Sequence, residues 1–252
     1  MLTSIALVAA AAASSWTVID APRPGIEWQC TSMVKQQWTT QVTGGNLQFS
    51  PRTPAAKNRD LVWAIGKRGM LVGRNRGLAG GTLEWVTDSG RQRRTLLDIS
   101  PVAFAEHRGD IFVAAGLSHR VLGDGSIYRL RSRSDGQWQI EKVLDLEEAP
   151  LGAYARNGSW YLVTVLGVTR LDLRTLQTTR VHQNMYWWHL DPASIVEHRD
   201  RWYIGARRGV IRLTRDGDGY REQWMVPSDC KTFVGDCECS PGAATAGSGA
   251  GR

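Results

Sequence analysis

An eleven-residue pattern occurs twice in this chain without a gap, and two looser versions lie between the copies. Residues 59–69 read RDLVWAIGKRG, and residues 199–209 read RDRWYIGARRG, 140 residues later. The looser versions are GDIFVAAG at 109–116 and GSWYLVTV at 158–165. The central aromatic residues of the four copies are 49, 49 and 42 residues apart. A period in the forties, made of short aromatic strands and Gly turns, predicts small β-sheets repeated along the chain.

The residues within each repeat follow the period of a strand and not that of a helix. In residues 201–206, Trp202, Ile204 and Ala206 face one way and the alternate residues face the other. An Arg-Leu pair marks a third strand three times, at 129–130, 170–171 and 212–213. Dipeptides such as Asp135-Gly136 and Asn157-Gly158 suit the tight turns between antiparallel strands. The sequence therefore predicts four repeats, at 48–99, 102–148, 150–186 and 190–227.

The repeats predict an all-β fold, a β-propeller of five blades with three to four antiparallel strands each, over residues 16–239. With 42% hydrophobic residues, the chain has enough apolar material for one such core. Residues 16–47 contain further strand-like runs. They either form a fifth blade alone, or share one with residues 228–236 and so join the two ends of the chain. No helix longer than about two turns is expected.

This layout resembles the β-propeller repeat proteins of the bacterial periplasm. The resemblance covers about 180 residues and rests on the RD-x-x-aromatic pattern with its Arg-Gly turn and on the Arg-Leu third strand. It implies architecture only. The signatures of WD repeats, kelch repeats and Asp-boxes are absent from the sequence, so the resemblance implies no functional residues.

The two ends of the chain predict export. Residues 1–15 form an apolar segment that is too short to span a bilayer and ends in small residues, which is typical of a signal peptide. The alternative is a buried N-terminal helix. Residues 240–252 consist mostly of Gly, Ala and Ser and predict a disordered tail. No later apolar stretch approaches 18 residues, so we expect no membrane span and a periplasmic or secreted protein.

The four cysteines lie near the ends of the chain, at Cys30, Cys230, Cys237 and Cys239. This clustering predicts disulfides that join the two ends, which an oxidising compartment permits. Cys30–Cys230 is the preferred pair, and Cys237 and Cys239 compete for it. A metal site at these cysteines is disfavoured because no His lies nearby.

Two segments depart from the repeat, and we predict that any ligand site lies near them. The first is the insertion at 117–125, where His119 and Arg120 are candidates for holding an anion. The second links two repeats and contributes the candidate residues Tyr186, Trp187, Trp188, His189 and Asp191. Flat aromatic rings beside a carboxylate suit a sugar ring or an apolar ligand. The competing interpretation is that these tryptophans only fill the space between blades.

No catalytic motif and no metal-ligand spacing is present, so the sequence predicts no metal and no cofactor and leaves catalytic residues unknown. Asp110, Asp191 and Glu197 are acidic residues that tertiary structure could bring together for glycoside hydrolysis. The formal net charge of +7 favours anionic partners, but no block of like charges predicts nucleic-acid binding. The leading hypothesis is an exported, monomeric, non-enzymatic propeller that binds a protein or glycan partner. The alternative is a carbohydrate-active hydrolase or lyase with carboxylates in the central channel, and a third possibility is a structural or assembly factor at the cell envelope.

Overall fold

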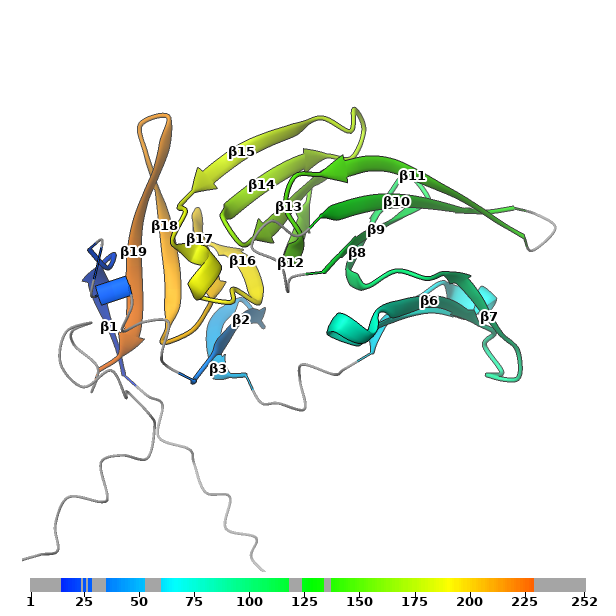
Figure 1. The fold of residues 1–252 in the computed structure, drawn as a ribbon, viewed down its shortest axis with the longest axis horizontal. Helices are drawn as coiled ribbons and strands as arrows, with labels where there is room; N and C mark the ends of the chain where they lie inside the picture. Colours follow the sequence, from blue (N-terminus) through cyan, green and yellow to red (C-terminus); the bar gives the residue numbers. More distant parts are fainter. Residues whose placement is uncertain are drawn as a thin grey trace, which may run out of the picture.

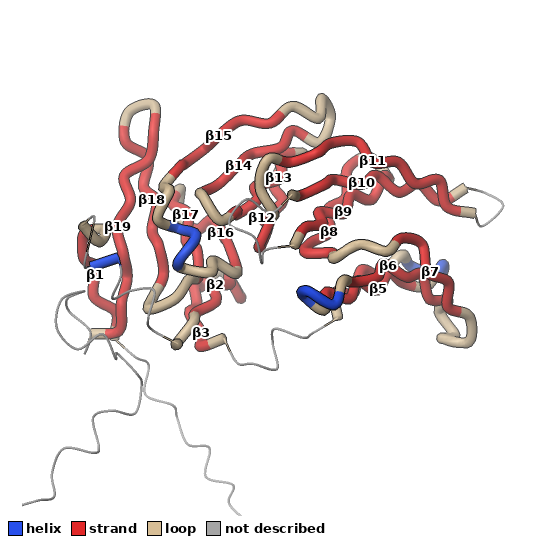
Figure 2. The backbone as a smooth tube through the Cα atoms, in the orientation of Figure 1, coloured by secondary structure: helices blue, strands red, loops and turns tan. Residues whose placement is uncertain are grey.

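The computed structural model describes residues 15–23, 25, 27–28, 35–52, 60–117, 124–133 and 137–228. These residues form antiparallel β-sheets, and the strands dominate the backbone trace (Figures 1 and 2). The helical residues among those described are Glu27 and Trp28 and three 3-10 helices of three residues each, namely η1 (Gly66–Arg68), η2 (Gly77–Ala79) and η3 (Trp187–His189). The all-β prediction is therefore confirmed.

Four sheets correspond to the four predicted repeats, except that the first residues of the predicted repeat 48–99 belong to a separate two-stranded sheet. Sheet 1 contains β4 (Leu61–Ala64), β5 (Met70–Asn75), β6 (Gly81–Val86) and β7 (Arg93–Leu97). Sheet 2 contains β8 (Pro101–His107), β9 (Asp110–Gly116), β10 (Gly125–Ser132) and β11 (Trp138–Leu146). Sheet 3 contains β12 (Pro150–Arg156), β13 (Ser159–Thr164), β14 (Gly167–Asp172) and β15 (Thr178–Gln183). Sheet 4 contains β16 (Ser194–His198), β17 (Arg201–Gly205), β18 (Val210–Asp216) and β19 (Gly219–Pro227).

The N-terminal strands divide between two sheets. β1 (Trp16–Asp20) pairs with β19 and becomes the fifth strand of sheet 4. β2 (Trp38–Thr43) and β3 (Asn46–Pro51) form a separate two-stranded sheet, which we call sheet 5. The structure thus combines the two predicted arrangements: the first strand joins the last repeat, while residues 38–51 make a sheet of their own.

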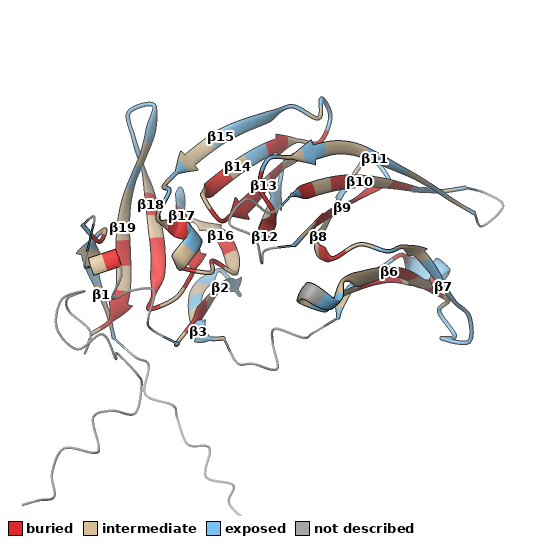
Figure 3. Ribbon diagram, viewed as in Figure 1, coloured by how far each residue is buried: buried red, intermediate tan, exposed pale blue. Residues whose placement is uncertain are grey.

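The sheets follow one another around an arc, and the first strands β8, β12, β16 and β2 lie on its inner side (Figure 1). β4 contacts β8, β8 contacts β12, β12 contacts β16, and β16 contacts β2. The buried residues form clusters between neighbouring sheets, and the outer hairpins are exposed (Figure 3). Each sheet therefore buries its apolar face against the next one, as radially repeated sheets do.

The two copies of the eleven-residue pattern occupy different places in their sheets, which corrects the predicted alignment. Trp63 of the first copy lies on β4, the first strand of sheet 1, whereas Tyr203 of the second copy lies on β17, the second strand of sheet 4. The pattern specifies a strand followed by a Gly turn, and this local signal is compatible with both the first and the second strand of a sheet. Its place in the sheet is set by the strands that precede it.

Several predicted features lie outside the described residues. They are the signal peptide, the C-terminal tail, His119, Arg120 and the cysteines at 30, 230, 237 and 239. Within the described residues, no helix is both long enough and apolar enough to cross a membrane.

Candidate functional site

The junctions between successive sheets are built from equivalent positions, which the strand pairing identifies. The first position is in the linker between two sheets, two residues before the proline that leads into the next sheet. It holds Ile99, Glu148 and Leu190. A second position lies on the fourth strand of sheets 2, 3 and 4, where it pairs with the residue just before the Arg-Leu pair. This position holds Lys142, Arg180 and Trp224. The equivalent second-strand positions hold Ala115, Thr164 and Ala206. Comparing these three positions shows how each junction is filled.

The junction between sheets 2 and 3 is closed by a polar interlock. Glu148 is buried and forms an ion pair with Arg180 on β15. Its other carboxylate oxygen accepts a hydrogen bond from the hydroxyl of Thr164 at the end of β13. The pocket that remains beside this interlock has a volume of about 270 Å³.

The junction between sheets 3 and 4 is filled with apolar side chains. Leu190, Ala206 and Trp224, at the same three positions, are fully buried. Trp187 from the connecting segment is also fully buried and belongs to the same core cluster. No interlock is needed here because large side chains occupy the space.

The junction between sheets 1 and 2 has neither arrangement. Ile99 and Ala115 stand where Glu148 and Thr164 form the polar interlock, and Lys142 stands in the place of Arg180. Lys142 instead forms an ion pair with Asp145, at 2.8 Å on its own strand. The two sheets are left with a pocket of about 810 Å³ between them, a volume typical of ligand sites. We define this as the junction pocket.

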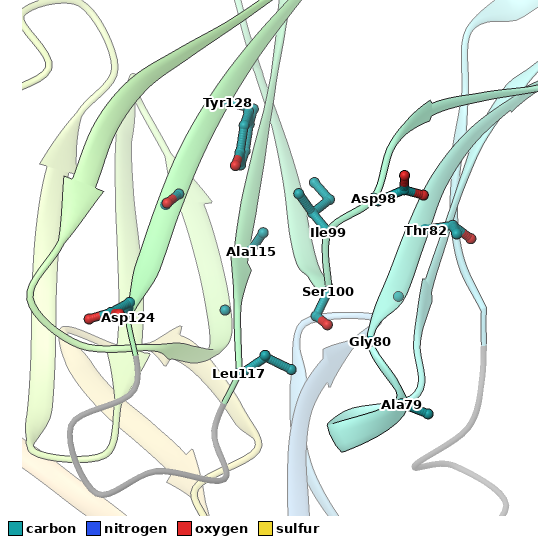
Figure 4. A pocket seen from close by; sticks show the side chains of 13 residues that line it. Ala79, Gly80, Thr82, Asp98, Ile99, Ser100, Ala115, Leu117, Asp124 and Tyr128 are labelled. Atoms are coloured by element: carbon teal, nitrogen blue, oxygen red, sulfur yellow. The ribbon is translucent and has the colours of Figure 1, made fainter.

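Figure 4 shows the junction pocket from close by. Ala115, Leu117, Asp124 and Tyr128 lie on the side of sheet 2. The opposite side is formed by sheet 1 and the segments next to its strands, with Ala79, Gly80, Thr82 and Asp98. Ile99 and Ser100, which connect the two sheets, lie between them.

Glycine shapes the wall where the two sheets meet. A Cβ at Gly81 would lie 2.3 Å from the backbone oxygen of Arg74 and 2.5 Å from that of Ile99. A Cβ at Gly116 would lie 2.8 Å from Cδ of Pro150. At Gly81 the close atoms belong to the neighbouring strand and to the linker after sheet 1, and at Gly116 they belong to the start of sheet 3, so a larger residue at either position would displace backbone beside the pocket.

The polar groups of the junction pocket are hydroxyls and carboxylates. Among the described residues, Asp98 and Asp124 have neither a hydrogen bond nor an ion pair. The hydroxyl of Thr82 is shielded from solvent and forms no hydrogen bond with any described residue. The half-buried ring of Tyr128 adds a flat surface and a phenol. The walls therefore offer several acceptors and one aromatic face to a polar ligand.

The structure separates the two predicted ligand segments. Leu117 and Asp124, which line the junction pocket, border the predicted insertion. By contrast, no described residue from 186 to 191 lines it. In that segment Trp187 is fully buried, whereas Trp188 is 44% exposed. Burial, together with the nearby positive charge of Arg207, lowers the pKa of His189.

The three candidate catalytic acids contact different arginines and do not form one cluster. Asp110 binds Arg131 within sheet 2, through two hydrogen bonds of 2.7 Å. Glu197 of β16 forms an ion pair with Arg156 of β12. Asp191 lies 3.9 Å from Arg207. Within the described residues, no group of three His, Cys, Asp or Glu is arranged to hold a metal ion.

A buried carboxylate cluster around Glu222 was not predicted from the sequence. Its Oε2 lies 2.9 Å from Nε2 of His182 and accepts hydrogen bonds from Asn184 and Trp187, and its Oε1 accepts one from Trp224. Burial raises the pKa of Glu222, but the hydrogen bonds that it accepts outweigh burial and hold the pKa below its ordinary value. Its donors are up to 40 residues away in sequence, so no local motif marks the cluster.

A third pocket, of about 420 Å³, lies on the inner side of the arc. The first strands of all five sheets contribute to it, through residues such as Thr40, Leu61, Val102, Leu151 and Ile195. Its walls are largely apolar, and none of the described residues that line it is a carboxylate.

Comparisons with known proteins do not assign this chain to a family. No protein-family model and no curated protein matches this chain. Among solved structures, it is similar to the extracellular domain of a hybrid two-component system of B. thetaiotaomicron, with 13% identity and a TM-score of 0.41. That match covers 75% of this chain and 27% of the other, so this chain spans about a quarter of its length. A luciferin-regenerating enzyme matches with 12% identity and a TM-score of 0.43, covering 79% of this chain and 76% of that protein.

Proposed function

We propose that this protein is an exported five-bladed propeller that binds a glycan in the junction pocket and carries out no chemistry itself. The five sheets are the blades, and the pairing of β1 with β19 closes the last blade with the first strand. Two observations support this architecture: first strands from all five sheets line one central pocket, and β1 completes sheet 4. The predicted signal peptide supports a periplasmic or secreted location.

The observation that carries the binding proposal is the missing interlock between sheets 1 and 2. The equivalent junctions are closed by a polar interlock or by large apolar side chains. Here Ile99 and Ala115 cannot form the interlock, and Lys142, which pairs with Asp145, stands where Trp224 fills the junction between sheets 3 and 4. The pocket that remains is large enough for one or two sugar rings. Hydroxyls, carboxylates and a tyrosine ring are the groups that bind sugar hydroxyls and cover the apolar face of a sugar.

A binding role is favoured over hydrolysis by the position of the carboxylates. The acidic candidates for catalysis contact three different arginines; they are Asp110, Asp191 and Glu197. The central pocket, where a hydrolase of this architecture would place its acids, has apolar walls in the part that the structure describes.

The test transfers the polar interlock of the neighbouring junction into the junction pocket. The triple variant Ile99→Glu, Ala115→Thr and Lys142→Arg reproduces the three residues that close the junction between sheets 2 and 3. We expect it to fold with an unchanged far-UV circular dichroism spectrum and to bind a glycan at least ten times more weakly than wild type. Binding is measured by isothermal titration calorimetry after a screen of disaccharides.

The single variant Lys142→Arg is the matched control, because it keeps the charge and leaves the pocket open. Equal affinity of the triple variant and wild type would contradict the proposed site. Release of reducing sugar from a bound glycan would contradict the non-enzymatic role.

A further inference from the structure

The strand β1 is the outermost strand of sheet 4, and its outer edge has no pairing partner among the described residues. It lies at one end of the arc, beyond β19 (Figure 1). The backbone N–H of Ser228 donates to the carbonyl of Ser15, and hydrogen-bonded pairs alternate along antiparallel strands. Every second residue of β1 therefore bonds to β19. The residues between them have backbone N–H and C=O groups that point outward, namely Trp16, Val18 and Asp20.

The outer edges of sheets 1, 2 and 3 carry features that prevent such an edge from pairing with another strand. In each of these sheets the register between the third and fourth strands is interrupted, as it is at a β-bulge. Their fourth strands also carry charged side chains, among them Arg93, Arg94, Glu141, Lys142 and Arg180. Bulges and charges of this kind keep the edge of a sheet from pairing with another chain.

The outer edge of sheet 4 has neither feature. The register from β18 through β19 to β1 runs without a shift. Thr17, Val18 and Ile19, at the centre of β1, are uncharged residues with β-branched side chains, which favour strand pairing. Val18 is also one of the exposed large hydrophobic residues. Comparison of the four outer edges therefore identifies β1 as the edge that is open to another strand.

We propose that two copies of this protein associate by pairing their β1 strands edge to edge, antiparallel, about a two-fold axis at Val18. The outward-facing residues 16, 18 and 20 are spaced symmetrically about Val18. Antiparallel pairing centred there places Val18 opposite its counterpart and Trp16 opposite Asp20 of the second copy. Every outward backbone group of both strands then has a hydrogen-bond partner. A second copy is the occupant that meets this condition exactly with the residues that β1 itself supplies.

This inference does not rest on the glycan-binding proposal, and it replaces the monomer expected from the sequence. A strand of five residues offers a small interface, so the association is weak and reversible. A dimer closed by a two-fold axis would carry two junction pockets on one particle. Two linked sites bind a polymeric ligand more tightly than either site alone.

Sedimentation equilibrium of the wild-type protein over a range of concentrations tests the association. We expect the average mass to rise from that of one copy to nearly that of two between about 5 and 500 µM, as a weak interface requires. Hydrogen exchange of the same protein is the second measurement. The amide of Val18 should become protected as the concentration rises, whereas the amides of the protected edge strand β11 should not change.

Charge variants at Val18 test the pairing and its register. Val18→Lys and Val18→Glu each place like charges opposite one another across the axis, so each variant alone should associate at least about tenfold more weakly than wild type. An equimolar mixture of the two variants should associate again, because opposite charges then face each other. Val42→Lys is the matched control, since Val42 on β2 has the same 40% exposure as Val18, and it should associate like wild type. Far-UV circular dichroism confirms that each variant is folded.

Each other outcome overturns a distinct part of the proposal. A mass of one copy at every concentration, with no change in the exchange of Val18, contradicts the dimer. Association of Val18→Lys as strong as that of wild type contradicts the role of β1. A mixture of the two charge variants that stays monomeric contradicts the register centred at Val18. Masses above that of two copies contradict the closed two-fold pairing. None of these outcomes bears on glycan binding in the junction pocket.

Discussion

Nε2 of His182 lies 2.9 Å from Oε2 of Glu222, so a single hydrogen bond joins the outermost strand of sheet 3 to the fourth strand of sheet 4. The same carboxylate accepts indole hydrogen bonds from Trp187 and Trp224. Its side chain is 7% exposed. A single acid thus holds two sheets and the segment that connects them.

Replacing Glu222 with Ala is expected to destabilise the protein by about 3–5 kcal/mol, because several buried donors would lose their acceptor at once. The free energy of unfolding is measured by urea denaturation. Glu141→Ala is the control, since Glu141 pairs with Arg129 but is 51% exposed, and its loss should cost less than about 1 kcal/mol. Equal effects of the two substitutions would contradict a central role for Glu222.

The Glu222 carboxylate also predicts how stability depends on pH. Its pKa in the folded protein is lowered, since the hydrogen bonds that it accepts outweigh the effect of burial. Its stabilisation is therefore fully present above the unfolded-state pKa of about 4.3 and is lost as pH falls through the folded-state pKa. The difference in unfolding free energy between wild type and Glu222→Ala should shrink between about pH 5 and pH 3. A constant difference over this range would show that the charge is irrelevant.

Truncation of the two neighbouring tryptophans of η3 should change the stability of the protein by very different amounts. Trp187 is fully buried, so Trp187→Ala is expected to cost about 3–5 kcal/mol. Trp188 is 44% exposed, so Trp188→Ala should change stability by no more than about 0.5 kcal/mol. Thermal unfolding of the two single variants measures both effects. A large loss with Trp188→Ala would mean that this side chain packs in solution.

Gly81 should tolerate no side chain, because a Cβ would lie 2.3 Å from the backbone oxygen of Arg74. We expect Gly81→Ala to destabilise sheet 1 by about 1–3 kcal/mol, as steric overpacking does. Gly219→Ala is the matched control, because the nearest atom to its Cβ would be 3.9 Å away. Hydrogen exchange of sheet 1 amides measures the effect, and unchanged exchange in Gly81→Ala would contradict it.

The disulfide prediction remains open to a direct experiment. The backbone N–H of Ser228 donates to the carbonyl of Ser15 at 2.9 Å, so the two ends of the described chain meet. We expect Cys30 to be joined to Cys230, which would stabilise the fold by roughly 4–5 kcal/mol in the chain-entropy model. Peptide mapping without reduction identifies the pair. Recovery of Cys30 as a thiol would rule it out.

The sheets could be predicted from the sequence because their information is local. Turn residues such as Asn157-Gly158 and the alternation around Trp202 lie within a few residues of the strands that they define. The position of a strand within its sheet is not local, so the pattern shared by Trp63 and Tyr203 does not predict that one lies on a first strand and the other on a second strand. The first strand of a sheet and the second have the same alternation and the same turn.

The pocket could not be predicted because it depends on comparing residues that are far apart. The roles of Ile99 and Lys142 emerge only when the fold shows that they occupy the positions held by Glu148 and Arg180 in the next junction. Glu222 was missed for a related reason. It lies in the mostly polar first half of β19, which is typical of an exposed hairpin, and its partner His182 comes from another sheet.

The pairing of β1 with β19 determines when folding can be completed. Thr17 and Ser228, whose hydroxyls are 3.1 Å apart, are separated by 211 residues. During synthesis, the first strand has no partner until almost all of the remaining sheets have been made, and closing so long a loop is slow. Sheets 1 to 3 can form while the chain emerges, but sheet 4 is completed last. A nascent chain stalled before residue 219 should therefore expose β1 to proteases and chaperones, whereas the finished protein protects it.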